Sequence, residues 1–442
     1  MMEADVQVLP ETRQDMLSFE LSFLPREWRL AKLRHAFNFN KGLTITKENL
    51  QDEGIPCVNY GEVHSKYGFE VDPARHPLKC VDVSYIEDNP ASLLKRGDFV
   101  FADTSEDIEG SGNFTCYNSD LQAFAGYHTL IAKPKVPMNA RFMAYLIDSQ
   151  TFRAQVQIEV KGVKVFSITQ AILKPTVVWF PPPHAQDAIA AFLDDKCAKI
   201  DGAVKIKEDQ IALLRERRQI IIQDAVTRGL NPAAPMKDSG IDWISQIPAH
   251  WDVVRFKYLF TQSRLPVQDD DEIVTSYRDG QVTLRSNRRL DGYTEAIIEG
   301  GYQGIRPGQL VLNSMDAFEG AIGVSDSAGK CTPEYVICNP NNSKINQNYF
   351  SYLLREMALA KYIQVICNAV RQRAVRIRFN NLATRFLAVP PLDEQKEIVD
   401  FIDAQKMKIA EAIAIKERQI AALKEYKTSL INAAVTGKIK VS

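Results

Sequence analysis

The sequence has 442 residues, with 54 lysines and arginines against 55 aspartates and glutamates, and a net charge of −1. This length suggests two or three domains with ample core. The balanced charge does not point to nucleic acid, although a local basic face would suffice to bind it. The seven cysteines form no Cys-x-x-Cys pair and the six histidines show no metal spacing, so we expect reduced, buried thiols and no metal site. The sequence has no run of about 18 apolar residues and no signal peptide. We therefore expect a cytoplasmic protein with no membrane contact.

Two stretches of the sequence are copies of each other. Residues 181–230 and 390–439 align without a gap at an offset of 209, with about two fifths identity. Both begin with two prolines and a glutamine, pass through Ile-x-x-Phe-x-Asp and end on Ala-Val-Thr. A Pro-x-x-Trp motif at Pro25 and Trp28 also recurs, at Pro248 and Trp251. The whole chain is therefore predicted to be a tandem repeat of a globular part followed by a long helix.

Each copied stretch predicts a helix with one narrow apolar stripe. Apolar residues recur alternately every three and four positions over more than four heptads, which favours a coiled coil over an ordinary surface helix. About 43 helical residues would give a helix of about 65 Å at ~1.5 Å per residue. We expect the two copies to pack on each other; the alternative is two separate amphipathic helices, each covering its own domain. The predicted seam consists of Leu193, Ile200, Val204, Ile211, Leu214 and Ile221 in the first copy and Ile402, Ile409, Ile413, Ile420, Leu423 and Leu430 in the second.

The globular parts have a mixed pattern. Short β-branched and aromatic runs between glycines and prolines predict strands at 98–102, 176–180, 310–313 and 335–338. Helical patterns at 140–156 and 347–365 precede the two long helices. We therefore predict an α+β chain in which two mixed α/β domains accompany the two long helices. The expected parts are a lead at 1–22, a domain at 23–180, a helical repeat at 181–230, a linker at 231–246, a second domain at 247–389 and a second helical repeat at 390–442.

Binding by this chain is better supported than catalysis. There is no phosphate-binding loop and no convincing catalytic constellation. Basic residues instead gather in the globular parts, where guanidinium groups could reach phosphates or guanine and amides could reach adenine. A solvated charged face is the alternative interpretation. The candidate DNA-binding residues are Lys161, Lys164, Arg285, Arg288, Arg289, Arg371, Arg373, Arg376, Arg378 and Asn380.

The order of these parts resembles the specificity subunit of type I restriction-modification systems. The resemblance is carried by the two helical repeats, by Ser-Gly-Ile-Asp-Trp at 239–243 ahead of Trp251, and by Pro-Pro-Leu-x-Glu-Gln at 390–395. It covers the chain from about Phe23 to its end. The first half departs from the pattern, because His184 and Ala185 stand where the second copy has an aspartate and a glutamate.

The resemblance implies a non-catalytic subunit with approximate twofold symmetry, in which two target-recognition domains are held by an antiparallel pair of helices. Each domain would read one half of a bipartite site in double-stranded DNA, and the helices would set the spacing. Two modification subunits that carry S-adenosylmethionine, and two restriction subunits that use ATP and Mg²⁺, would be its partners, while the chain itself would bind no cofactor. Three alternatives stay open: a specificity subunit of a methyltransferase-only or type II-like system, a coiled-coil scaffold that binds only protein, and an enzyme fused to recognition domains.

Overall fold

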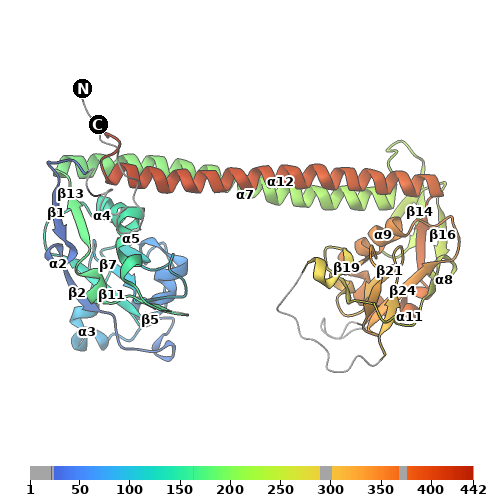
Figure 1. Cartoon of the computed structure of the whole chain (residues 1–442), viewed down its shortest axis with the longest axis horizontal. Helices are drawn as coiled ribbons and strands as arrows, with labels where there is room; N and C mark the ends of the chain where they lie inside the picture. Colours follow the sequence, from blue (N-terminus) through green and yellow to red (C-terminus); the bar gives the residue numbers. More distant parts are fainter. Residues whose placement is uncertain (1–20, 22–23, 163, 289–300, 368–375, 442) are drawn as a thin grey trace. The chain divides into compact units, whose positions relative to one another are not determined.

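The computed structural model describes residue 21 and residues 24–162, 164–288, 301–367 and 376–441. Nearly all of the predicted lead at 1–22 lies outside the described residues. The chain divides into two compact units: unit 1 comprises Met1–Lys207 and Arg418–Ser442, and unit 2 comprises Glu208–Glu417. Each unit contains one mixed α/β domain and a part of both long helices, α7 (Pro183–Arg228) and α12 (Leu392–Val435) (Figure 1).

The domain of unit 1 contains a five-stranded sheet in the order β2-β11-β7-β9-β4 and a four-stranded sheet in the order β5-β3-β10-β6. Outside these sheets, β1 pairs with β13, the strand that leads into α7. The strands are β1 (Arg29–Lys32), β2 (Phe37–Lys41), β3 (Ile55–Val58), β4 (Phe69–Val71), β5 (Cys80–Val81), β6 (Leu93–Leu94), β7 (Phe99–Ala102), β8 (Thr104–Ser105), β9 (Phe114–Tyr117), β10 (Ala123–Ala125), β11 (Thr129–Pro134), β12 (Phe166–Ser167) and β13 (Val177–Phe180). The helices are α2 (Leu33–Ala36), α3 (Tyr85–Asp88), α4 (Ala140–Asp148), α5 (Gln150–Glu159) and α6 (Gln170–Leu173).

In its described residues, the domain of unit 2 repeats this plan with a four-stranded main sheet in place of a five-stranded one. Its main sheet has the order β17-β24-β21-β22, and β16 pairs with β25, the strand that leads into α12. The strands are β14 (Met236–Ile241), β15 (Ile244–Pro248), β16 (Asp252–Arg255), β17 (Phe260–Gln262), β18 (Val274–Ser276), β19 (Val282–Leu284), β20 (Gln303–Ile305), β21 (Leu310–Asn313), β22 (Ile322–Val324), β23 (Gly329–Cys331), β24 (Tyr335–Pro340) and β25 (Phe386–Val389). The helices are α8 (Phe256–Leu259), α9 (Gln347–Leu359), α10 (Tyr362–Ile366) and α11 (Phe379–Ala383). The hairpin of β14 and β15 occupies much of the segment expected as a linker.

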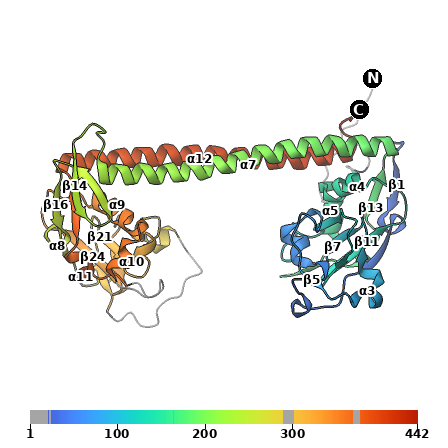
Figure 2. The ribbon, with the colours of Figure 1, turned by 180° about the vertical axis from the view of Figure 1, so that it is seen from behind.

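Both main sheets are buried on their two faces. In β7, Phe99 and Phe101 belong to the core that includes α4 and the long helices, whereas Val100 and Ala102 belong to a separate cluster on the opposite face. The alternation follows from the strand itself, since successive side chains point to opposite faces. In unit 2, Leu310 and Leu312 of β21 belong to the core that includes the long helices, and Val311 belongs to a separate cluster on the opposite face. Helix α9 packs between the main sheet and the long helices (Figure 2).

The four predicted strands are confirmed as β7, β13, β21 and β24. The predictions of one helix at 140–156 and one at 347–365 were wrong in one respect. In the structure each stretch forms two helices, α4 and α5 in the first case and α9 and α10 in the second. Ser149 has extended backbone angles and its side chain accepts a hydrogen bond from the backbone of Phe152, so it ends α4 and caps α5. Between α9 and α10 the break falls at Lys361, which has a φ of 60°. Neither break has a proline or glycine to mark it in the sequence.

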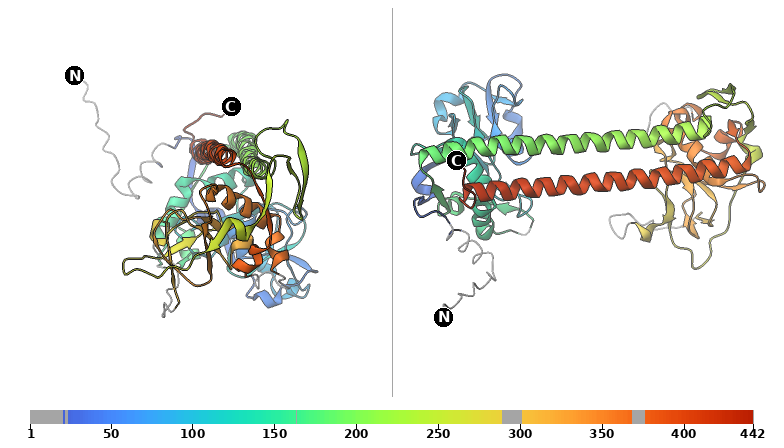
Figure 3. Two further views of the ribbon diagram at one scale, coloured as in Figure 1. Left: turned by 90° about the vertical axis from the view of Figure 1, so that its right-hand side faces the viewer. Right: turned by 90° about the horizontal axis from the view of Figure 1, so that it is seen from above.

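The long helices pack on each other within each unit (Figure 3). In unit 1 the start of α7 lies beside the end of α12, where Lys427 forms an ion pair of 2.7 Å with Asp201. In unit 2 the end of α7 lies beside the start of α12. The helices are therefore antiparallel in both units, and the alternative of two separate amphipathic helices is wrong. Of the predicted seam, Leu193, Ile200, Val204, Ile211, Ile402, Ile409 and Leu430 are buried, and Leu214, Ile221, Ile413, Ile420 and Leu423 are partly buried.

A buried glutamine fixes the start of each long helix. The side-chain amide of Gln395 donates to the carbonyl oxygen of Pro390 at 2.8 Å, and its oxygen accepts from the backbone N–H of Asn346 at 2.8 Å. Asn346 is the residue that caps α9, so one side chain joins the helix start to the domain. In unit 1 the equivalent bonds join Gln186 to Pro181 at 2.9 Å and to Asn139 at 3.0 Å.

A glycine after each long helix packs against a tryptophan of the Pro-x-x-Trp motif. Gly229 follows α7 with a φ of +72°, and a Cβ atom there would lie 3.2 Å from the ring of Trp251. Gly437 follows α12 with a φ of +70°, and a Cβ atom there would lie 3.2 Å from the ring of Trp28. Glycine suits both the left-handed backbone and the close contact. The motif therefore recurs because both units need the same helix-end contact.

The buried glutamine should be more important for stability than an exposed one on the same helix. We expect Gln395→Ala to destabilise unit 2 by about 1–3 kcal/mol, because the buried backbone groups it satisfies lose their partner. The measurement is the midpoint of thermal unfolding, with Gln419→Ala, at an exposed position of α12, as the control. Equal midpoints for the two variants would show that the glutamine does not hold the helix start.

Candidate nucleic-acid interface

The basic residues predicted for the first domain lie on an exposed connection. Lys161 and Lys164 stand between α5 and β12, and both are exposed. Their ammonium groups can reach phosphates, but a connection of this kind provides no enclosed recognition site. In unit 1 the prediction therefore rests on two accessible cations.

The second basic cluster is partly engaged within the domain. Arg285 lies in a short 3-10 helix, Arg285–Asn287, directly after β19, and Arg288 follows it. The guanidinium of Arg288 forms an ion pair of 2.9 Å with Asp279 and stacks 4.1 Å from the ring centre of Tyr277. Arg289 lies outside the described residues. A nucleic acid would have to compete with Asp279 for Arg288.

The third cluster contributes to a cavity. Arg371 and Arg373 lie outside the described residues, and Arg376 forms an ion pair of 3.8 Å with Glu334. Arg378 and Asn380, by contrast, line a cavity of about 370 Å³ at the start of α11. Within this cluster, Arg376 is thus partly neutralised by Glu334, whereas Arg378 and Asn380 face an open space.

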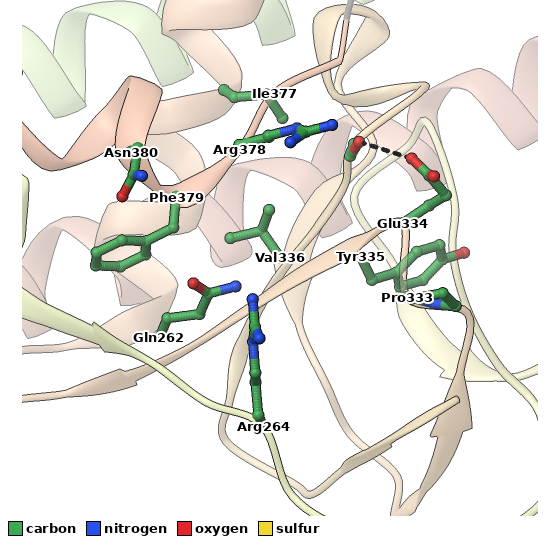
Figure 4. A pocket seen from close by; sticks show the side chains of 11 residues that line it. Gln262, Arg264, Pro333, Glu334, Tyr335, Val336, Ile377, Arg378, Phe379 and Asn380 are labelled. Atoms are coloured by element: carbon green, nitrogen blue, oxygen red, sulfur yellow. Dashed lines mark hydrogen bonds between the residues drawn. The ribbon is translucent and has the colours of Figure 1, made fainter. Parts of the chain in front are cut away.

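This cavity, which we call the polar cavity, gathers groups from three parts of unit 2 (Figure 4). Gln262 ends β17 and Arg264 follows it, while Glu334 precedes β24. Glu334 also accepts a hydrogen bond of 3.5 Å from the hydroxyl of Ser314. No carboxylate of the described residues forms an ion pair with Arg264 or Arg378. Two guanidinium groups and two amides therefore converge with their donors available to a ligand.

Gln262 and Arg264 were missed in the sequence. They stand far from Asn380 along the chain, and they line the same cavity only in the folded domain, where β17 pairs with β24. Their spacing of two residues at the end of a strand was the one local signal, since it places both side chains on the same face of extended backbone. That signal is too common in proteins to identify a site by itself.

The long helices expose large apolar side chains away from their shared seam. In unit 2, Leu213 and Ile220 of α7 and Met407 of α12 are 63%, 49% and 75% exposed. In unit 1, Ile206 and Tyr426 are also exposed. Leu213 and Ile220 are seven residues apart and so lie on one face of α7, and exposed apolar residues that share a face are a feature of surfaces that bind other proteins.

Two properties of the described residues bear on chemistry: possible metal ligands and the burial of thiols. Among them, no group of three or more His, Cys, Asp or Glu side chains could hold a metal ion. Burial raises the pKa of the Cys57, Cys116 and Cys331 thiols to about 12, so these cysteines remain protonated and unreactive at neutral pH. Within the described part of the chain, no helix is long and apolar enough to cross a membrane.

Comparison with known proteins connects this architecture to one class. No protein-family model matches the sequence. The chain is 22% identical to the protein of Methanocaldococcus jannaschii described as the type I restriction enzyme MjaX specificity subunit, over 96% of each sequence. Its fold matches a chain from a structure of the assembly and conformational transition of the type I restriction-modification system, with a TM-score of 0.67, 15% identity, and coverage of 94% of this chain and 99% of that one. It also matches the HsdS subunit of Thermoanaerobacter tengcongensis, with a TM-score of 0.52, 16% identity, and coverage of 94% and 98%.

The likeness extends over nearly the whole length in both sequence and fold, and it includes both domains and both long helices. Over nearly its whole length the chain is therefore similar to specificity subunits of the type I restriction-modification class. The α+β fold predicted from the sequence, with two mixed domains and a packed helix pair, is confirmed.

Proposed function

We propose that this chain is the specificity subunit of a type I restriction-modification complex and gives that complex its DNA sequence specificity, with each globular domain reading one half of a bipartite site. The observation that carries the proposal is the duplication: one chain presents two versions of the same domain, each attached to the same helical framework. Two different recognition surfaces on one chain suit a target with two different halves. The polar cavity of unit 2 and the exposed lysines of unit 1 are the candidate contact sites.

The partners follow from the framework. Two modification subunits, which carry S-adenosylmethionine, would dock on the long helices, where exposed side chains such as Leu213 and Met407 offer apolar contact. Because the framework is repeated, two identical partners could bind equivalent surfaces of one asymmetric chain. Two restriction subunits using ATP and Mg²⁺ would complete a cytoplasmic complex. This chain would bind no cofactor and perform no chemistry itself.

The polar cavity fits recognition of a base edge. Arginine pairs with the O6 and N7 acceptors of guanine in the major groove, and asparagine and glutamine pair with adenine. Arg264 and Arg378 provide the first kind of group, and Gln262 and Asn380 provide the second. We infer that this cavity reads a purine of the half-site that belongs to unit 2.

The function is tested by methylome sequencing of a methylation-free host. The host expresses this chain together with the methyltransferase encoded beside it, and the control host expresses the methyltransferase alone. We expect a split motif with N6-methyladenine only when the chain is present. A protein-only scaffold would produce no new motif even with the partner expressed. Methylation by the purified chain alone would instead revive the fused-enzyme alternative.

Variants of the polar cavity should relax only one half of that motif. Arg264→Ala or Arg378→Ala would remove a contact worth about 1–3 kcal/mol of discrimination between bases, so we expect degeneracy at one position of one half-site. Lys344→Ala, which removes an exposed cation of the same unit that does not line the cavity, is the control and should leave the motif intact. The assignment fails if both arginine variants retain the original motif at the original methylation frequency.

The length of the helices should determine the spacer. Seven residues add about 10 Å of helix at ~1.5 Å per residue, which is about three base pairs at ~3.4 Å each. We expect one heptad inserted into both α7 and α12 to lengthen the spacer of the methylated motif by about that amount. A seven-residue insertion in the exposed loop at 341–343 is the control. An unchanged spacer in the helix variant would exclude the helices as the ruler.

A further inference from the structure

A second cavity of unit 2, of about 680 Å³, lies where α7, α9 and α12 meet the turn between β18 and β19. We call it the basic cavity, because each of these four elements contributes one cation to its lining. The cations are Arg218 from α7, Arg278 from the turn, Arg355 from α9 and Lys406 from α12. It shares no residue with the polar cavity, and none of the candidate DNA-binding residues lines it.

Arg355 is the most confined of these cations. A Cβ atom on Gly280, which has a φ of +91°, would lie 2.4 Å from a terminal nitrogen of the Arg355 guanidinium, so the turn fits directly against this side chain. The Nε atom of Arg355 is buried and has no hydrogen-bond partner. Burial lowers the pKa of Arg355, since the charged form loses hydration. The guanidinium has one backbone partner, since its Nη2 atom donates to the carbonyl oxygen of Arg278 at 3.4 Å. A partly buried cation with an unused donor is costly unless an anion meets it.

The carboxylates that line the basic cavity, Asp279 and Asp403, form no ion pair with Arg355 and are engaged elsewhere. Asp279 forms its ion pair with Arg288. Asp403 accepts a hydrogen bond from the hydroxyl of Tyr352. Arg278 is offset by two acids outside the lining, Asp316 at 3.0 Å and Glu319.

The other two cations are less engaged. Lys406 donates to the Tyr352 hydroxyl at 2.8 Å and lies 3.7 Å from Asp403, and burial lowers its pKa. Arg218 is exposed and forms no ion pair with a carboxylate of the described residues. Three of the four cations are therefore unmatched or weakly matched.

The duplication provides an internal comparison. Unit 1 has a cavity of about 360 Å³ in the equivalent place, where Tyr145 donates to Asp194 as Tyr352 does to Asp403. At the positions of Arg218, Arg355 and Lys406, this cavity has Lys427, Asp148 and Cys197.

Its two cations are matched by acids. Arg141 forms an ion pair of 2.7 Å with Asp194, and Lys427 forms one of 2.7 Å with Asp201. The same framework thus encloses a charge-matched cavity in unit 1 and a cationic cavity in unit 2.

We propose that the basic cavity of unit 2 is an anion site that binds a phosphoryl group, supplied either by a DNA backbone or by a small phosphorylated compound. Arginine side chains suit phosphate because their planar donors make paired, charge-assisted hydrogen bonds with its oxygens. A volume of this size accommodates a small ligand. The inference goes beyond the proposed sequence recognition and does not rest on it, because it concerns different residues and a different chemical group.

The test is calorimetric titration of the full chain with pyrophosphate. We expect binding with a stoichiometry of one, because only one of the two equivalent cavities carries unmatched cations. Arg218→Gln should weaken the affinity about tenfold or more, since it removes a charge-assisted contact from an exposed position. Lys427→Gln, at the equivalent position of unit 1, is the matched control and should bind as the natural chain does.

A second variant protects the test against loss of folding. Lys406→Cys introduces the side chain that unit 1 has at the same place, and it should also weaken binding while leaving the thermal unfolding midpoint close to that of the natural chain. The proposal is overturned if pyrophosphate does not bind, if two molecules bind with equal affinity, or if Arg218→Gln and Lys427→Gln behave alike.

The source of the phosphoryl group is decided by competition. Double-stranded DNA is added to the pyrophosphate-bound chain assembled with its methyltransferase. Displacement of pyrophosphate assigns the site to a DNA backbone, and retention assigns it to a small phosphorylated ligand. Both results support the site. Absence of a methylated motif would contradict the proposed function alone, because pyrophosphate binding needs no sequence recognition.

Discussion

The packing of α7 against α12 is the contact on which the rest of the structure depends. A helix with one narrow apolar stripe cannot bury that stripe on its own, and most helical stability in proteins comes from tertiary packing of such a face. Here each stripe is covered by the other copy, in unit 1 through residues such as Leu193 and Leu430 and in unit 2 through residues such as Ile222 and Ile402. Both units therefore combine segments that are distant in the sequence, and neither core is complete without parts of both helices.

The contacts that attach each domain to the helices are the ones that the two halves share. Gln186 and Gln395 form the same hydrogen bonds at the helix starts, and Gly229 and Gly437 allow a tryptophan to pack at the helix ends. These contacts are buried and geometrically demanding, so a change at one of them leaves a polar group unsatisfied or creates a clash. The exposed lining of the cavities has no such restriction. The residues that define the framework therefore recur, while those that would meet a ligand differ between the units.

The sequence predicts the parts of this structure that depend on local periodicity. The long helices, the packed pair and the main strands follow from apolar spacing, which is the same in the sequence and in the fold. The polar cavity could not be predicted, because Gln262 and Asn380 are distant in the sequence and line the same cavity only in the folded domain. The engagement of Arg288 by Asp279 was equally hidden, since a run of arginines looks the same whether its charges are free or already matched. The breaks near Ser149 and Lys361 were also missed, because the apolar spacing continues across a local serine cap and across a single residue with positive φ.

The two equivalent cavities differ in charge, although the long helices that line them are copies of each other. The tyrosine–aspartate contact persists in both units, so the two cavities share their framework, yet Asp148 in one unit stands where Arg355 stands in the other. Asp148 is matched by Arg153 at 2.9 Å, whereas Arg355 forms no ion pair with a carboxylate of the described residues, so an added anion suits the cavity of unit 2 and not that of unit 1. Identical partner subunits, by contrast, need equivalent surfaces on the two halves. Contacts with such partners are therefore expected on the repeated faces of the long helices, and contacts specific to one half are expected in the cavities where the repeat has diverged.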